Sequence, residues 1–306
     1  MKFHLAVLAA LVFAAGIRAA DATRPNILFI IFDDWGWQHA GAYGCDWVKT
    51  PNFDRVAKEG VLFKNAFTSN PKCSPCRATS LTGRNSWQLE EAVCHGGIFP
   101  PKFAVYPDLL EKGGYTVGLT GKGWGPGEFK LEGRTRNPAG PAFDEFKQEV
   151  PAKGITTTDY PRNFEAFLAQ RDKAQPFCFW MGFKEPHRSY ELDSGVRLGK
   201  KLEDVKVPGY LPDNATVRGD LADYAIEVEW GDKQIGQALE MLEKSGLLED
   251  VYQPIYETQK CTAQASGLIG QPMLISTFSP PVNTGVPGGN EVERTWLLFV
   301  TVKQPE

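Results

Sequence analysis

The chain has 306 residues, of which 42% are hydrophobic and 23% are charged, a balance typical of globular proteins rather than disordered or fibrous ones. Its formal net charge of -4 at pH 7 excludes the strongly basic surface by which many proteins bind nucleic acid. We therefore expect one large globular domain or two smaller ones, without a nucleic-acid partner.

The N-terminal segment has the pattern of a secretory signal peptide. Lys2 precedes an apolar run from residue 5 to residue 15, and small residues follow it. This pattern predicts a signal peptide over residues 1–20, with cleavage between about Ala19 and Ala22. A membrane anchor is the alternative, but the run is short for a span of about 20 residues. We expect an exported protein that is periplasmic, extracellular or lysosome-like according to its host, without a membrane span after signal removal.

Three segments are predicted to form buried strands that end in polar residues. They are NILFIIFDDWGW (26–37), TVGLTGKGW (116–124) and PFCFWMGFKEPH (176–187). Continuous apolar runs of this kind are typical of parallel strands that are buried on both faces. The polar residues that end the runs are Asp33, Asp34, Lys122 and His187.

Helical patterns lie between and after these strands. They begin at polar residues or prolines, and Gly60 and Gly246 are two of their stop signals. The expected helices cover residues 51–60, 106–114, 159–170 and 216–246. Strands that alternate with helices predict an α/β fold, in which a mostly parallel sheet carries helices on both faces.

In such a sheet, ligands bind beyond the carboxyl ends of the strands, so we expect Asp33, Asp34, Lys122 and His187 to face one edge. Two adjacent carboxylates at a buried strand end need a compensating charge. A hard divalent cation supplies it, and oxygen ligands favour calcium or magnesium. The alternative is a pair of solvated loop aspartates.

The stretch SNPKCSPCRATSLTGR (69–84) contains two cysteines and is predicted to begin a helix. Pro75 suits the first turn of that helix, which places Cys73 at or just before its N-terminus. The helix dipole there would acidify the thiol, as in redox Cys-x-x-Cys sites. Cys73 and Cys76 could therefore form a redox pair, but such a pair has no need of Arg77 and the residues that follow.

Residues 73–84, CSPCRATSLTGR, resemble the signature of the sulfatase family, Cys-x-Pro-x-Arg with a Leu-Thr-Gly-Arg ending. Residues 24–37 resemble the first strand of the same family, with its metal-binding pair at Asp33 and Asp34. Three other stretches, LTGKGWGPG, FKEPHRSY and YLPDNATVRGDLADY, are similar to the heparan N-sulfatase branch. The resemblance covers residues 24–250 and implies an alkaline-phosphatase-like α/β sandwich with an incomplete C-terminal part.

The resemblance also implies a chemistry for these residues. A formylglycine-generating enzyme would oxidise Cys73 to formylglycine, and the hydrated aldehyde would attack the sulfur of a sulfate ester or sulfamate on a sulfated sugar. Asp33, Asp34 and the oxidised residue 73 would bind one divalent cation, expected to be calcium.

The same resemblance implies further catalytic residues. Arg77 would orient the diol, Lys122 and His187 would contact sulfate oxygens, and His187 would protonate the leaving group. The sequence departs from the family pattern at Trp124, where a histidine is common. Aromatic stacking on a sugar is one role that Trp124 could have there.

The pattern changes after residue 250. A second acidic pair would complete the metal site in a sulfatase, but none follows, and Pro254 interrupts the expected strand. We expect residues 251–306 to be a truncated or frameshifted tail, or a poorly ordered one; an unusual ending that still folds is the alternative. The expected function is hydrolysis of sulfated glycans. The alternatives are a catalytically incomplete fragment and a phosphodiester or phosphonate hydrolase of the same superfamily.

Overall fold

The computed structural model describes residues 24–248, together with the backbone of two later strands at residues 272–278 and 296–301. The expected signal peptide lies outside the described residues, and so does most of the segment that follows residue 250. The two later strands, β4 (Pro272–Phe278) and β5 (Trp296–Thr301), pair with each other in antiparallel orientation.

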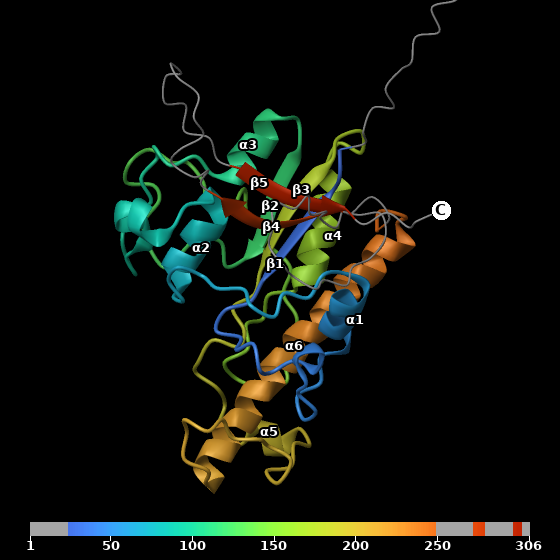
Figure 1. Cartoon of the computed structure of the whole chain (residues 1–306). Coiled ribbons are helices and arrows are strands. Elements are labelled where there is room, and N and C mark those ends of the chain that lie inside the picture. Colours follow the sequence, from blue (N-terminus) through green and yellow to red (C-terminus); the bar gives the residue numbers. More distant parts are fainter. Residues whose placement is uncertain (1–23, 249–271, 279–295, 302–306) are drawn as a thin grey trace, which may run out of the picture.

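Three parallel strands form the central sheet, as the apolar runs predict (Figure 1). They are β1 (Ile27–Ile31), β2 (Thr116–Gly121) and β3 (Phe177–Gly182), in the order β1-β3-β2. Ile31 and Gly121 both pair with Gly182, the last residue of β3. The carboxyl ends of all three strands therefore lie at one level, which brings the segments that follow them together.

The strands differ in burial. Every residue of β3 is buried, and so are the inner residues of β2, whereas all five residues of β1 are only partly buried. The prediction of burial on both faces is therefore right for β2 and β3 and wrong for β1. Strand order does not explain the difference, because β1 and β2 each have one strand neighbour within the described residues. β2 is in addition packed against α3 and α4, which bury its inner residues.

The helices expected from the sequence are confirmed, with ends shifted by one or two residues. They are α1 (Pro51–Glu59), α2 (Cys73–Thr82), α3 (Tyr106–Lys112), α4 (Tyr160–Gln170) and α6 (Ala215–Lys244). Short helical turns connect them: Gly41–Tyr43, Ser86–Gln88, Glu90–Val93 and α5 (Ser194–Arg197). Within the described residues, no helix combines the length and the hydropathy that a membrane span requires.

Side-chain caps explain where the two longest helices begin. The side chain of Asn214 accepts a hydrogen bond of 3.0 Å from the backbone N–H of Val217, at the start of α6. Asp159 accepts one of 3.0 Å from Arg162 at the start of α4. Each cap satisfies a backbone donor that has no partner inside the helix, which stabilises the helix by roughly 1 kcal/mol.

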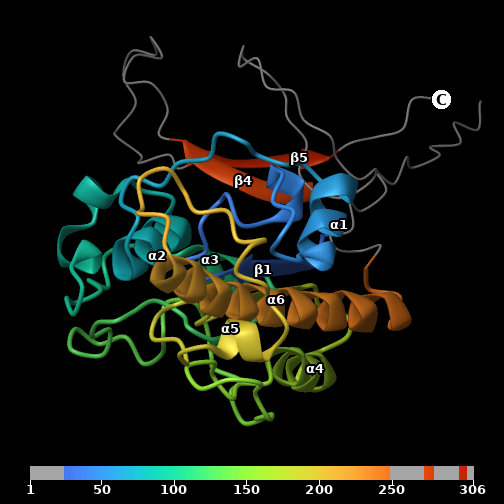
Figure 2. The same ribbon diagram turned by 90° about the horizontal axis from the view of Figure 1, so that it is seen from below.

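The core lies on both faces of the sheet. Side chains alternate between faces along a strand: Cys178 and Trp180 of β3 pack with residues of α2 and α3, whereas Phe177, Phe179 and Met181 pack with residues of α4 and α6. Helices thus cover both faces of the sheet, and α6 runs across the face that carries Phe177, Phe179 and Met181 (Figures 1 and 2). This arrangement confirms the expected α/β sandwich.

Candidate active site

The segments that leave the three strands are held together by backbone hydrogen bonds. Phe183 N–H donates to the carbonyl oxygen of Ile31 at 2.8 Å, and Asp33 N–H donates to that of Glu185 at 3.0 Å. Lys122 N–H donates to the carbonyl oxygen of Gly182 at 2.7 Å. These bonds extend the sheet pairing beyond the regular strands and fix where the polar side chains emerge.

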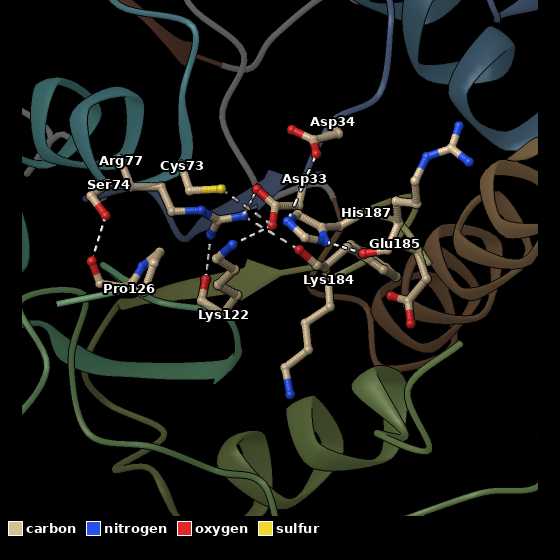
Figure 3. A network of polar contacts seen from close by, with 12 residues as sticks. Asp33, Asp34, Cys73, Ser74, Arg77, Lys122, Pro126, Lys184, Glu185 and His187 are labelled. Carbon is tan, nitrogen blue, oxygen red and sulfur yellow. Dashed lines mark hydrogen bonds and ion pairs between the residues drawn. The ribbon is translucent and has the colours of Figure 1, made fainter. Parts of the chain in front are cut away.

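Asp33 lies at the centre of the polar network (Figure 3). Its side chain is buried, and Lys122 Nζ donates to its Oδ2. Arg77 Nη2 lies 3.5 Å from Oδ1, and Cys73 Sγ lies 3.9 Å from Oδ2. Two protein cations therefore compensate the charge of this buried carboxylate, which would otherwise be strongly destabilising.

Arg77 joins helix α2 to the ends of β2 and β3. It is 1% exposed, and its guanidinium donates to the carbonyl oxygens of Lys122, Gly123 and Phe183, the last two at 3.3 Å. Burial lowers the pKa of Arg77 from its ordinary value, and the charge of Asp33 opposes that effect. Because Arg77 is fully engaged with the protein, it positions Asp33 and the helix rather than a substrate.

Cys73 is the first residue of α2 and is buried against Asp33. The expectation that the helix N-terminus acidifies this thiol is wrong. Burial raises the pKa of Cys73, and the negative charge of Asp33 raises it further, against the opposing effect of Lys122. Cys73 and Cys76 are both free thiols in the structure. The structure therefore gives no support to the redox interpretation.

Asp34 does not share the environment of Asp33. Its backbone is in the left-handed region, with φ of 67°, a conformation that aspartate tolerates better than most residues. Its side chain is 56% exposed, whereas that of Asp33 is 5% exposed. The two adjacent carboxylates at this strand end are therefore not equivalent, because only Asp33 is buried and protein cations compensate its charge.

His187 comes from the loop after β3 and completes the cluster. Its Nε2 lies 3.9 Å from Asp34 Oδ2, and its Nδ1 lies 2.6 Å from the carbonyl oxygen of Arg188. A carbonyl oxygen only accepts hydrogen bonds, so Nδ1 carries the hydrogen and Nε2 presents a lone pair. One donor atom each from Asp33, Cys73 and His187 lie within 4.8 Å of one another.

The donor atoms of this cluster are of the type that binds a hard divalent cation. Asp33 and Asp34 supply carboxylate oxygens, and a residue with oxygen in place of the sulfur of Cys73 would supply another. Calcium takes six to eight oxygen ligands, so these residues provide part of a calcium shell. The arrangement suits a cation shared between the protein and an anionic substrate.

Trp124 has a structural role. It is 3% exposed, its Nε1 donates to the carbonyl oxygen of Ala92 at 3.2 Å, and its ring packs edge-on against Phe99 with centroids 5.1 Å apart. Trp124 therefore belongs to the core, and the suggestion that it stacks on a sugar is wrong.

Two residues that the sequence analysis missed support the loop carrying His187. Glu185 is 1% exposed, and its carboxylate accepts hydrogen bonds from Tyr160 Oη at 2.9 Å and from the backbone of Thr156 at 2.8 Å. Tyr160 Oη in turn accepts from the backbone N–H of Lys184 at 2.9 Å. An acidic residue two positions after the end of an apolar run was a signal for Glu185, whereas no pattern in the sequence distinguishes Tyr160.

Comparison with known proteins identifies the family. A sequence model described as Sulfatase matches residues 25–252. The chain belongs to the sulfatase family. Members of this family generally use a formylglycine and a divalent cation.

Three sulfatases with curated names illustrate the similarity. Human N-sulphoglucosamine sulphohydrolase is 31% identical over 257 residues, which cover 74% of this chain and 49% of that protein. N-acetylglucosamine-6-O-sulfatase of Bacteroides thetaiotaomicron is 29% identical over 258 residues, or 78% of this chain and 44% of the relative. Dog N-acetylgalactosamine-6-sulfatase is 42% identical over 125 residues, which cover 36% of this chain and 23% of that protein. The chain thus spans at most about half the length of these relatives.

Solved structures confirm the alkaline-phosphatase-like fold of this sulfatase. BT4656, in complex with its substrate D-glucosamine-2-N,6-O-disulfate, matches with a TM-score of 0.54 and 21% identity, over 74% of this chain and 64% of that one. The phosphonate monoester hydrolase of Agrobacterium radiobacter matches with a TM-score of 0.58 and 19% identity. The match covers 74% of this chain and 61% of the hydrolase.

Proposed function

We propose that this chain is the catalytic part of an exported sulfatase that hydrolyses sulfate esters or sulfamates of glycosaminoglycan sugars. The observation that carries the proposal is the position of Cys73, which belongs to the sulfatase signature and lies against Asp33, the carboxylate that Lys122 and Arg77 contact. A nucleophile derived from Cys73 would face a cationic side chain that can bind sulfate and a carboxylate that can bind a metal ion.

The names of the relatives favour a sulfated amino sugar as substrate. The human relative is named for N-sulfoglucosamine, and the substrate of BT4656 is a glucosamine disulfate. Both carry sulfate on a glucosamine nitrogen. We therefore expect N-sulfoglucosamine units to be the first substrates to test.

Cys73 is the position at which formylglycine would form, and the hydrated aldehyde would supply the oxygen that attacks sulfur. Lys122 is the side chain placed to bind the transferred sulfate, since it is partly exposed and reaches the cluster from β2. Its positive charge would stabilise the negative charge that develops on the sulfate oxygens. Arg77 keeps Asp33 in place while this occurs.

Asp33 and Asp34 would hold a calcium ion, which would supply Lewis acidity at the sulfate oxygens. His187 is placed to assist departure of the sugar. Its Nδ1 is committed to the carbonyl oxygen of Arg188, so a proton taken up by the ring resides on Nε2. From Nε2 it can pass to the leaving oxygen or nitrogen as a general acid.

The proposal is tested by producing the chain with and without a formylglycine-generating enzyme. Mass spectrometry of the peptide containing Cys73 measures conversion, and turnover is measured with an aryl sulfate, an aryl phosphate and N-sulfoglucosamine. We expect sulfate or sulfamate hydrolysis only in converted protein, and none in Cys73→Ala.

Two outcomes would contradict the proposal. Faster turnover of the aryl phosphate than of the aryl sulfate would favour the phosphodiester or phosphonate hydrolase. Full conversion of Cys73 without any turnover would favour the catalytically incomplete fragment.

A further inference from the structure

Before any oxidation, the cluster presents a different set of donor atoms from that of a calcium site. Cys73 offers sulfur, His187 offers nitrogen and Asp33 offers oxygen, all within 4.8 Å of one another. Calcium binds oxygen almost exclusively. A sulfur, nitrogen and oxygen set is typical of zinc and of the divalent transition metals.

The orientation of His187 matches that of a metal-binding histidine. Such residues usually donate the hydrogen of one ring nitrogen to a carbonyl or carboxylate, which directs the lone pair of the other nitrogen to the metal ion. His187 makes this contact from Nδ1 to the carbonyl oxygen of Arg188 at 2.6 Å. Figure 3 shows its ring beside the carboxylate of Asp33, with Asp34 on the same side.

Asp34 is available as a fourth donor. Its Oδ2 lies 3.9 Å from Nε2 of His187 and its side chain is largely exposed. Asp33 and Asp34 balance the two cations, Lys122 and Arg77, and a third negative group, the thiolate at Cys73, forms only when a metal ion displaces the thiol proton. The types of donor atom, rather than an excess of negative charge, therefore favour a divalent transition metal here.

The distances require only a small adjustment. Zinc lies about 2.0–2.3 Å from its ligands in a tetrahedral site, which places the ligand atoms about 3.3–3.7 Å apart. The donor atoms of Asp33, Cys73 and His187 lie within 4.8 Å of one another, so these three need to approach by about 1 Å. His187 is the residue that can make this movement, because its side chain is 45% exposed and lies on a loop. Asp34 lies outside that group, 3.9 Å from Nε2 of His187, and its exposed side chain has to turn farther to reach the ion.

We propose that the folded, unoxidised chain contains a zinc-type site formed by Cys73, His187 and Asp33, with Asp34 as the fourth ligand. Binding forms the sulfur–metal bond, and the thiol proton leaves to solvent without any change of oxidation state. Conversion of Cys73 to an oxygen-bearing residue removes the sulfur. The same site then prefers a hard cation such as calcium. Whether the site binds zinc or calcium would therefore indicate whether Cys73 has been converted. This inference concerns the unmodified thiol and does not depend on sulfatase activity.

Cobalt(II) is a suitable probe, because a cobalt–thiolate bond gives a charge-transfer absorption that calcium cannot produce. The full chain is produced without a formylglycine-generating enzyme, and the free thiol at Cys73 is verified by mass spectrometry. We expect one equivalent of cobalt to give the thiolate band, zinc to displace it, and a large excess of calcium to leave it unchanged.

Three variants test the ligands. Cys73→Ser should remove the band. His187→Ala should weaken binding by about 100-fold or more, since losing a residue that merely supports a metal ligand already costs about 10-fold to 100-fold. Cys76→Ser is the matched control, since Cys76 lies three residues farther along the same helix and outside the donor group. It should keep both the band and the affinity.

The proposal is overturned if the band persists in Cys73→Ser, if Cys76→Ser abolishes it, or if calcium displaces cobalt. Absence of cobalt and zinc binding in the unmodified chain would overturn it as well. If Cys73→Ser fails to fold, as judged by circular dichroism, His187→Ala decides the question, because its half-exposed side chain can be truncated without opening the core. Unchanged affinity in that variant would contradict the site.

Discussion

Lys122 and Asp33 form an ion pair that crosses the central strand of the sheet. Lys122 follows β2 and Asp33 follows β1, and these strands lie on opposite sides of β3. The pair therefore exists only because the three strands end at one level. It holds the candidate sulfate-binding cation beside the candidate metal ligand.

Loss of either partner should affect catalysis and stability differently. Lys122→Ala leaves Asp33 paired with Arg77, so we expect a fall in kcat of about 10²–10³, as for loss of one oxyanion donor, with a modest loss of stability. Asp33→Asn leaves two cations without their counter-ion and should cost about 3 kcal/mol of unfolding free energy as well as the activity. Turnover of an aryl sulfate and urea unfolding measure the two effects.

Lys64→Ala is the control for Lys122→Ala, because Lys64 is an exposed lysine outside the cluster. It should retain activity and stability. Equal loss of activity in both lysine variants would contradict the role given to Lys122.

The contact between Tyr160 and Glu185 should position the loop that carries His187. In Tyr160→Phe, the backbone N–H of Lys184 loses its acceptor, and the buried carboxylate of Glu185 loses a donor. We expect a cost of about 1–3 kcal/mol, a lower kcat and faster hydrogen exchange at the amide of Lys184.

Tyr210→Phe is the matched control for this change, since Tyr210 is 78% exposed. It should behave as the unchanged protein does. Unaltered exchange at Lys184 in Tyr160→Phe would show that the tyrosine does not hold the loop.

Glu227 should make stability fall as the pH rises. It is buried on α6 and neither carboxylate oxygen has a hydrogen-bond partner among the described residues. Burial, together with the charge of Glu185, raises the pKa of Glu227 to about 8 from an ordinary 4.5. Between these values the unfolded chain has released its proton while the folded chain retains it, so rising pH favours unfolding, by roughly 4 kcal/mol above pH 8.

Glu227→Gln removes this titration and should gain stability relative to the parent as the pH rises from 5 to 9. Urea unfolding across that range measures the difference. Glu165→Gln is the control, because it removes a glutamate charge of the same size from an exposed position of α4. If both variants follow the same pH profile, Glu227 does not titrate with a raised pKa.

Maturation of Cys73 should require an unfolded chain. Cys73, Pro75 and Arg77 are all buried in helix α2, so a modifying enzyme that reads these residues cannot reach them in the folded protein. We expect conversion of the chain in urea-unfolded or nascent form, and none after folding. Mass spectrometry of the peptide measures conversion, and equal conversion of folded protein would contradict the expectation.

Local patterns in the sequence were sufficient for the elements and for the family. The apolar runs predicted β1, β2 and β3, and the proline and glycine positions predicted the helices, because these signals act within a few residues of one another. The signature around Cys73 was recognisable for the same reason, since the helix and its N-terminal cysteine occupy one short segment.

Only the tertiary structure decided the electrostatics of the site. The sequence treats Asp33 and Asp34 as equals, but the turn at Asp34 exposes one carboxylate and buries the other between Lys122 and Arg77. Likewise, burial beside Asp33 outweighs the helix N-terminus at Cys73 and raises its pKa. Charge and burial at a site depend on residues brought together from distant segments, and local sequence patterns do not contain that information.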